Sequence, residues 1–208
     1  MKKLILSIAA IVGLSAGAAT ATTLSFDGAT GSTVISNNDL GLGLDGLTID
    51  FITGDLKDAT NGLSVDTGAV VTYTYLGFEA ANSNFVSNSS GTPGFINGSS
   101  SVGDTISVTQ GPGLLEFAFG TSAPASAVGF FDNAGTAAPA SSAYAIGAIQ
   151  LTSSAFLVLF DDIAANNRDF DDIGILVKVA PIPLPAAGIL LATALGGIGL
   201  YGRRRRTA

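Results

Sequence analysis

Residues 71–75 read Val-Thr-Tyr-Thr-Tyr, and residues 115–119 read Leu-Glu-Phe-Ala-Phe. In both stretches the odd-numbered side chains are large and apolar, whereas the even-numbered ones are small or polar. Successive side chains of a β-strand point to opposite faces, so a period of two is typical of a strand with one buried face. The two stretches therefore predict a half-buried β-sheet.

Seven further stretches rich in apolar and β-branched residues predict strands, because clusters of Gly, Asn, Asp and Ser separate them. They are residues 23–26, 47–51, 105–108, 128–131, 144–151, 156–160 and 173–179. No long helical period occurs between them, so little α-helix is expected. Nine strands at these spacings predict an all-β fold, a β-sandwich of jelly-roll or immunoglobulin-like type. Residues 82–101 and 134–142 are predicted to be mobile surface loops.

The composition excludes several classes of function. The chain contains neither Cys nor His, which excludes a disulfide framework, the usual zinc sites, a Cys nucleophile and a Ser-His-Asp triad. All 16 acidic residues lie between residues 22 and 180, against three basic ones, so this body carries a formal charge of −13. Such a charge repels the phosphates of nucleic acids, and no nucleic-acid partner is expected.

The N-terminus has the three regions of a secretory signal peptide. Two lysines follow the first Met, residues 4–14 are apolar, and Ala19 and Ala21 fit the small-residue cleavage pattern. Residues 1–21 are therefore predicted to be removed on export. An uncleaved N-terminal anchor is the alternative, although the apolar run is short for a membrane span.

The C-terminus combines a Pro-rich motif, an apolar stretch and a basic cluster. These parts are Ile182, Pro183, Leu184, Pro185 and Ala186, then residues 186–202, then Arg203, Arg204, Arg205 and Arg206. The apolar stretch is at the lower limit for a helix that crosses a hydrocarbon core about 30 Å thick. Four arginines hold their end in the cytoplasm, so the body is predicted to lie outside the membrane. A buried core helix with a basic tail is the alternative.

This order of parts resembles the PEP-CTERM type of sorting signal, in the variant that reads Val-Pro-Leu-Pro-Ala, with Ile182 in place of Val. The resemblance covers residues 181–208, after a body of residues 22–180. It implies processing near the Pro motif by an exosortase-type enzyme of a Gram-negative bacterium. It also implies passage from an inner-membrane intermediate to the cell surface or the extracellular matrix, and association with exopolysaccharide, biofilm or matrix proteins.

The densest acidic segment, residues 160–174, joins two predicted strands. Its carboxylates are Asp161, Asp162, Asp169, Asp171 and Asp172, accompanied by Asn166 and Asn167. Concentrated oxygen ligands favour Ca²⁺ over Mg²⁺, which retains its waters. The segment resembles the acidic loops near the C-terminal end of secreted, calcium-associated β-sandwich domains. Two alternatives stay open: a solvated hairpin loop in which Arg168 pairs one carboxylate, and a catalytic role.

The sequence thus predicts a non-catalytic exported protein whose body binds polysaccharide or matrix proteins and is stabilised by calcium. The chain has no Trp, so Tyr73, Tyr75 and Tyr144 are the candidates for stacking on sugars. The alternatives are a permanently membrane-anchored envelope protein and a secreted hydrolase that acts through carboxylates. A hydrolase of the glycosidase kind needs two carboxylates across a cleft. Of the two glutamates, Glu79 and Glu116, the second alternates with apolar neighbours and is predicted to face solvent.

Overall fold

The computed structural model describes the greater part of the predicted body. The described residues are 21–80, 83–87, 93–122, 128–135, 144–162, 169–183 and 193. Residues Ala21–Pro181 form one compact unit. The rest of the predicted signal peptide and most of the sorting signal, including the Arg cluster, lie outside the described residues. Among the described residues, no helix is both long enough and apolar enough to cross a membrane.

The compact unit consists of antiparallel strands in three sheets, so the prediction of an all-β fold is confirmed. The largest sheet has the order β2-β3-β12-β13-β14-β5-β8, formed by Gly31–Val34, Thr48–Thr53, Ala145–Thr152, Ala155–Asp161, Ile173–Pro181, Ala69–Gly77 and Thr105–Gln110. A second sheet has the order β11-β10-β6-β7, formed by Val128–Asp132, Ala118–Ser122, Ser83–Ser87 and Pro93–Ile96. The third, β1-β4-β9, is formed by Leu24–Asp27, Gly62–Val65 and Gly113–Leu114. The one short 3-10 turn that the described residues contain is η1, Gly54–Leu56.

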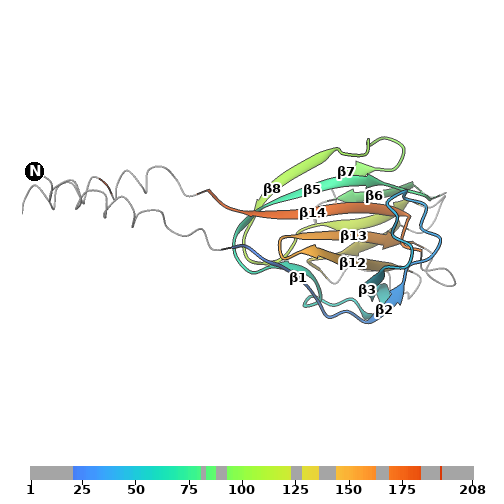
Figure 1. The fold of residues 1–208 in the computed structure, drawn as a ribbon, viewed down its shortest axis with the longest axis horizontal. Helices are drawn as coiled ribbons and strands as arrows, with labels where there is room; N and C mark the ends of the chain where they lie inside the picture. The colour runs from blue at the N-terminus through green and yellow to red at the C-terminus, as the bar shows by residue number, and fades with distance from the viewer. Residues whose placement is uncertain are drawn as a thin grey trace, which may run out of the picture. The chain divides into compact units, whose positions relative to one another are not determined.

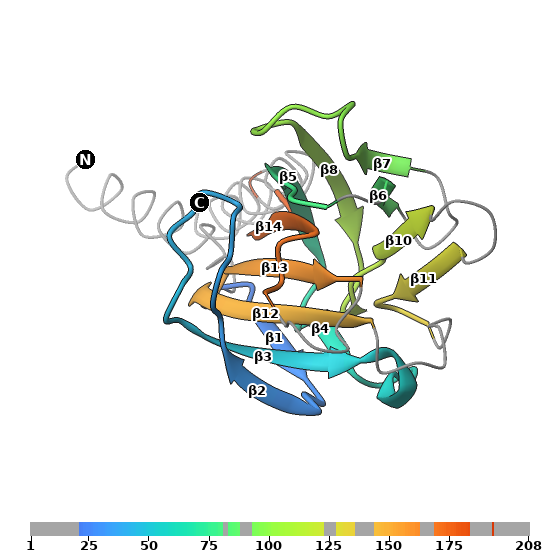
Figure 2. The same ribbon diagram turned by 90° about the vertical axis from the view of Figure 1, so that its right-hand side faces the viewer.

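The two smaller sheets cover one face of the seven-stranded sheet, here called the inner face (Figures 1 and 2). The odd-numbered side chains of 71–75 point into the core between these layers, as predicted. The ring of Phe117 packs 5.9 Å from that of Tyr73, and the ring of Phe119 stacks 5.2 Å from that of Phe160. Two layers joined by such a core are consistent with a β-sandwich.

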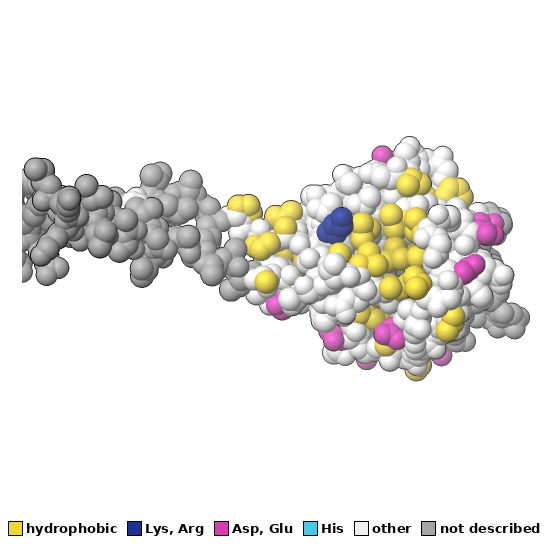
Figure 3. Space-filling view, viewed as in Figure 1, with side chains coloured by type: hydrophobic (Ala, Val, Ile, Leu, Met, Phe, Trp, Pro, Cys, Tyr) yellow, Lys and Arg dark blue, Asp and Glu magenta, His cyan; other side chains and the backbone are white. Residues whose placement is uncertain are grey.

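The opposite face of the seven-stranded sheet, here called the outer face, carries a second apolar cluster. Residues 35–47 cross one end of this face as a strap between β2 and β3. The strap side chains Ile35 and Leu44 are buried against apolar residues of β3 and β13, and Leu40 packs beside them. Figure 3 shows apolar side chains gathered at the middle of the same face. The sheet therefore has apolar residues on both faces.

The stretch 115–119 alternates as predicted only as far as Phe117: Leu115 and Phe117 are buried and Glu116 is exposed, but Ala118 is buried as well as Phe119. Its backbone is not one strand, however, because β9 ends at Leu114 and β10 begins at Ala118. The three residues in between carry the chain from the three-stranded sheet to the four-stranded sheet. Alternation of burial thus stops where the chain enters the four-stranded sheet.

Five strands, β2, β4, β6, β7 and β9, go beyond the predicted set. Because β6 and β7 lie within residues 82–101, the prediction of a mobile loop there is wrong for residues 83–87 and 93–96. Strand β6 is paired on both sides, by β10 and by β7, although its sequence is largely polar. Its neighbours in the sheet, rather than its composition, make it a strand. Residues 136–142 of the second predicted loop lie outside the described residues.

A buried asparagine joins the two smaller sheets. Asn133 directly follows β11, and its side chain is 0% exposed. Its Oδ1 accepts a hydrogen bond from the Leu63 N–H at 2.8 Å, and its Nδ2 donates to the carbonyls of Leu63 at 2.9 Å and Leu115 at 2.8 Å. Gly62 leaves room for this amide, since a Cβ at that position would lie 2.5 Å from Oδ1.

Replacing Asn133 by Ala should lower the free energy of unfolding by about 1–3 kcal/mol, because the Leu63 N–H loses its acceptor inside the protein. Urea denaturation of the full chain measures this loss. Thr109→Ala is the control, because Thr109 is exposed on β8, and it should change the free energy by less than about 0.5 kcal/mol. An equally small effect at both positions would show that Asn133 does not hold the sheets together.

Candidate functional site

The carboxylates of the acidic segment lie where β13 ends and β14 begins. Asp161 is the last residue of β13, Asp162 follows it, and Asp171 and Asp172 come directly before β14. The side chains of Asp161, Asp162 and Asp171 are only 2%, 4% and 3% exposed. Burying an ionised carboxylate costs free energy unless it is paired, hydrogen-bonded or neutralised. These three carboxylates are therefore buried, whereas those of a solvated hairpin loop would be exposed.

The strap of residues 35–47 binds this acidic turn from the outer face. The Nδ2 of Asn38 donates to the carbonyl of Asp169 at 2.9 Å and to that of Phe170 at 3.2 Å. The N–H of Asp39 donates to Oδ2 of Asp171 at 3.0 Å. One carboxylate of the turn is thus used to hold a segment more than a hundred residues earlier in the chain.

Phe170 anchors the turn between its flanking carboxylates. Its side chain is buried, and its ring lies 5.9 Å from that of Phe51. Its φ of +56° is in the left-handed region, which costs a residue with a Cβ about 1 kcal/mol. Burial of an aromatic ring is worth more than that cost, about 1.5–3 kcal/mol, so the strained backbone is retained. The burial of Phe170 therefore fixes the backbone between Asp169 and Asp171 beside β3.

Asp172 is hydrogen-bonded by Asp162 and by two asparagines, Asn84 and Asn97. Its Oδ2 accepts the N–H of Asp162 at 2.6 Å, which ties the two ends of the turn together. Asn84 of β6 and Asn97 donate to the Asp172 carbonyl at 3.4 and 3.2 Å. Asn84 is fully buried, and its Oδ1 has no hydrogen-bond partner within the described part of the chain. An amide oxygen is therefore available beside the carboxylates.

The site favours protons or a cation. Burial raises the pKa of Asp172 to about 8, and the carboxylates of Asp162, Asp161 and Asp169 raise it as well. Burial also raises the pKa of Asp171 to about 6, although the hydrogen bond from Asp39 acts in the opposite direction. In the absence of a cation, Asp172 is therefore largely protonated at neutral pH.

The chemistry of the donors fits Ca²⁺, which prefers carboxylate, amide and carbonyl oxygens. Their arrangement does not form a metal site by itself. Among the described residues, no group of three or more acidic side chains is placed to hold a metal ion. Residues 163–168, which include Asn166, Asn167 and Arg168, lie outside the described residues. Calcium binding by the five predicted aspartates therefore stays a prediction.

Two of the three predicted sugar-stacking residues are misplaced for that role. Tyr73 and Tyr75 are only 6% and 1% exposed, because both point into the core, so the expectation that they stack on sugars is wrong. Tyr144 is half-buried, with its ring 6.2 Å from that of Phe160. Glu116 faces solvent, as predicted, and Glu79 is also exposed.

The described part of the sorting motif is accessible. Strand β14 ends at Pro181, and Ile182 and Pro183 are both exposed. Leu184, Pro185 and Ala186 lie outside the described residues, as do Arg203, Arg204, Arg205 and Arg206. At the other end of the unit Ala21 is exposed, whereas Ala19 is not described.

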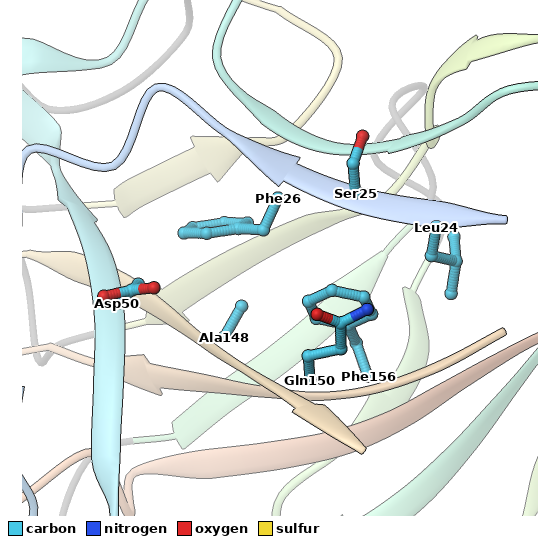
Figure 4. Close-up of a pocket in the computed structure, with 7 residues that line it drawn as sticks. All are labelled: Leu24, Ser25, Phe26, Asp50, Ala148, Gln150 and Phe156. Atoms are coloured by element: carbon cyan, nitrogen blue, oxygen red, sulfur yellow. The ribbon is translucent and has the colours of Figure 1, made fainter. Parts of the chain in front are cut away.

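A hollow that no sequence pattern predicted lies between β1 and the seven-stranded sheet (Figure 4). Its volume is ≈ 270 Å³, and its lining consists of Leu24, Ser25, Phe26, Asp50, Ala148, Gln150 and Phe156. These residues come from β1, β3, β12 and β13, which are far apart in the sequence. No local pattern could have brought them together.

Comparison with known proteins identifies no relative of this chain. No family model, curated protein or solved structure matches the chain. A functional conclusion must therefore rest on the residues at the two ends and on the surfaces of the β-structure.

The raised pKa values predict that stability falls as pH rises. Between about pH 4, where an unfolded Asp loses its proton, and about pH 8, the folded state binds a proton at Asp172 that the unfolded state does not. The free energy of unfolding should therefore decrease across this range in EDTA. Urea denaturation at a series of pH values measures the slope.

Asp172→Asn should flatten most of this slope, because the amide does not titrate. Asp55→Asn, which alters an exposed carboxylate of η1, serves as the matched control and should leave the slope unchanged. If Asp172→Asn and the unaltered protein show the same pH dependence, the buried carboxylate is not its cause.

Proposed function

We propose that this chain is a non-catalytic, exported bacterial protein of the cell surface or extracellular matrix, delivered by a C-terminal sorting signal. The observation that carries the proposal is the order of three parts after β14: the Pro motif at 182–186, the apolar stretch at 186–202 and four arginines at 203–206. The compact β-structure ends at Pro181, directly before the motif, which supports a division between body and signal.

The proposed route begins with export directed by residues 1–21. The apolar stretch then holds an inner-membrane intermediate, with the body outside and the arginines in the cytoplasm. An exosortase-type enzyme processes the chain near the Pro motif. The exposure of Ile182 and Pro183 supports this step, because a processing enzyme needs accessible backbone. Pro183 has no N–H to donate to a sheet, so the chain leaves β14 as an extended segment.

The body is proposed to be a β-sandwich, of jelly-roll or immunoglobulin-like type, that associates with polysaccharide or matrix proteins. The seven-stranded sheet with smaller sheets on its inner face supports the sandwich. The formal charge of −13 between residues 22 and 180 suits a soluble surface domain that attracts cations.

Calcium is proposed to stabilise the last hairpin of this body. Three carboxylates at most 4% exposed and the raised pKa of Asp172 support a need for positive charge at the turn. The Oδ1 of Asn84, which accepts no hydrogen bond from the described residues, adds a neutral oxygen donor nearby. A cation bound there would join β13, β14 and the strap, and would stabilise the folded state in proportion to its concentration.

Addition of Ca²⁺ in place of EDTA should raise the melting temperature of the full chain, and by more near pH 8 than near pH 5, because protons compete for the same carboxylates. Differential scanning calorimetry measures the shift. Mg²⁺ at equal concentration should produce a smaller one. Asp172→Asn should reduce the Ca²⁺ effect, and Asp55→Asn should preserve it. Equal melting temperatures in Ca²⁺ and EDTA would rule out the calcium proposal.

Processing should leave a mature chain that ends near residues 181–186. Peptide mapping by mass spectrometry of the protein from its native cells identifies the new terminus. A double variant, Pro183→Ala with Pro185→Ala, should retain the tail, whereas Thr109→Ala should be processed normally. An intact terminus at Ala208 in the unaltered protein would instead favour a permanently anchored envelope protein.

A further inference from the structure

The hollow beneath β1 has a floor made of two cross-strand pairs. Asp50 of β3 lies opposite Ala148 of β12, and Gln150 of β12 lies opposite Phe156 of β13. Directly opposed residues of antiparallel strands share one face of the sheet, so all four side chains lie on the inner face. Ala148 is the smallest of them, and its position between larger neighbours leaves the space that the hollow occupies.

Strand β1 forms the roof. The N–H of Leu24 donates to the carbonyl of Ser153 at 2.8 Å, which fixes β1 over the end of the β12–β13 hairpin. The side chains of Leu24 and Phe26 extend from β1 on the side of the floor, whereas the Ser25 hydroxyl points away (Figure 4). That hydroxyl is 2.9 Å from the hydroxyl of Ser64. Ser25 therefore contributes backbone to the hollow, not its polar group.

The hollow combines two aromatic rings with two polar groups that are free to bind. Phe26 is half-buried and Phe156 is almost fully buried, while Asp50 and Gln150 are exposed. Within the described residues, neither the Asp50 carboxylate nor the Gln150 amide has a hydrogen-bond partner. The carboxylate accepts hydrogen bonds, and the amide both donates and accepts them. A ligand that fits must therefore offer an apolar face together with several hydroxyl groups.

We propose that this hollow binds one uncharged pyranose ring of a polysaccharide. The C–H groups of such a ring would pack against Phe26, and its hydroxyls would bond to Asp50 and Gln150. The volume of ≈ 270 Å³ lies just below the range of about 300–1,000 Å³ for drug-sized ligands, which suits one ring and not an oligosaccharide.

Charge restricts the ligand further. The lining contains one carboxylate and no basic side chain, and the body around it carries a formal charge of −13. A uronic acid, sulfate or phosphate group would be repelled, so the sugar is neutral. The site thus deepens the proposed function: it rests on that function for the origin of the polysaccharide, but its geometry is independent of the sorting signal.

Saturation-transfer NMR on the full chain in phospholipid nanodiscs tests the site without a sugar-based detergent. The probes are the methyl glycosides of glucose, galactose and mannose, with methyl glucuronide as the acidic counterpart. At least one neutral glycoside should bind saturably at millimolar concentration, and methyl glucuronide should bind more weakly. Asp50→Asn and Gln150→Ala should each weaken binding about tenfold, because each removes hydrogen bonds to a hydroxyl.

Asp55→Asn is the matched control for lost charge, since Asp55 is exposed outside the hollow, and it should bind normally. Binding that is absent for every neutral glycoside, or unchanged in Asp50→Asn and Gln150→Ala, would overturn the proposal. Binding of glucosamine that disappears on N-acetylation, with no neutral sugar bound, would also overturn it, because the site would then recognise an ammonium group beside a carboxylate. Loss of sugar binding with normal C-terminal processing would sink this inference alone, whereas an intact tail would sink the sorting proposal alone.

Discussion

The seven-stranded sheet depends on the insertion of its last strand. Strand β14 lies between β13, its neighbour in the sequence, and β5, which comes far earlier in the chain. Without β14 the sheet would separate into β2-β3-β12-β13 and β5-β8. The inward side chains Ile173, Ile175 and Val177 are fully buried, and each such burial is worth about 1.5–3 kcal/mol. This exceeds the net value of one hydrogen bond, about 0.5–1.5 kcal/mol, so apolar burial along β14 dominates the joining of the two halves.

The acidic turn leads the chain into β14. The cost of burying its carboxylates opposes the free energy gained by burying the apolar side chains of that strand. Its carboxylates are drawn out of water because Phe170 and Ile173 on either side are fully buried. The hydrogen bonds from Asn38, Asp39 and Asn97 compensate in part by fixing the carbonyls and one carboxylate of the turn. The remaining electrostatic cost appears as the raised pKa of Asp172. Stability of the central strand is thereby linked to whatever neutralises the turn.

Sequence reasoning succeeded where the signal is local and failed where it is not. Strands β5 and β14 could be predicted because their apolar residues alternate or run continuously within one strand. Strand β6, with the sequence Ser-Asn-Phe-Val-Ser, carries no such pattern and is a strand because two neighbours pair with it. Alternation correctly placed Tyr73 and Tyr75 on the buried face of their strand, and that burial excludes the sugar-stacking role that was also predicted for them. The hollow was missed because it needs Phe26 of β1 to meet residues of β3, β12 and β13, which no local pattern relates.

At the start of the folded unit, the predicted cleavage site at Ala21 lies directly before the residues that hold β1 over the hollow. The N–H and hydroxyl of Thr23 donate to the two carboxylate oxygens of Asp66 at 2.9 and 2.7 Å, and these bonds lower the pKa of Asp66. Leu24 then begins β1, which roofs the hollow. A signal peptide cut after Ala21 leaves all of these contacts in place, whereas a cut a few residues later would remove the bonds that hold β1 over the sheet. The proposed cleavage after Ala21 is therefore compatible with the contacts that hold β1 over the proposed binding surface.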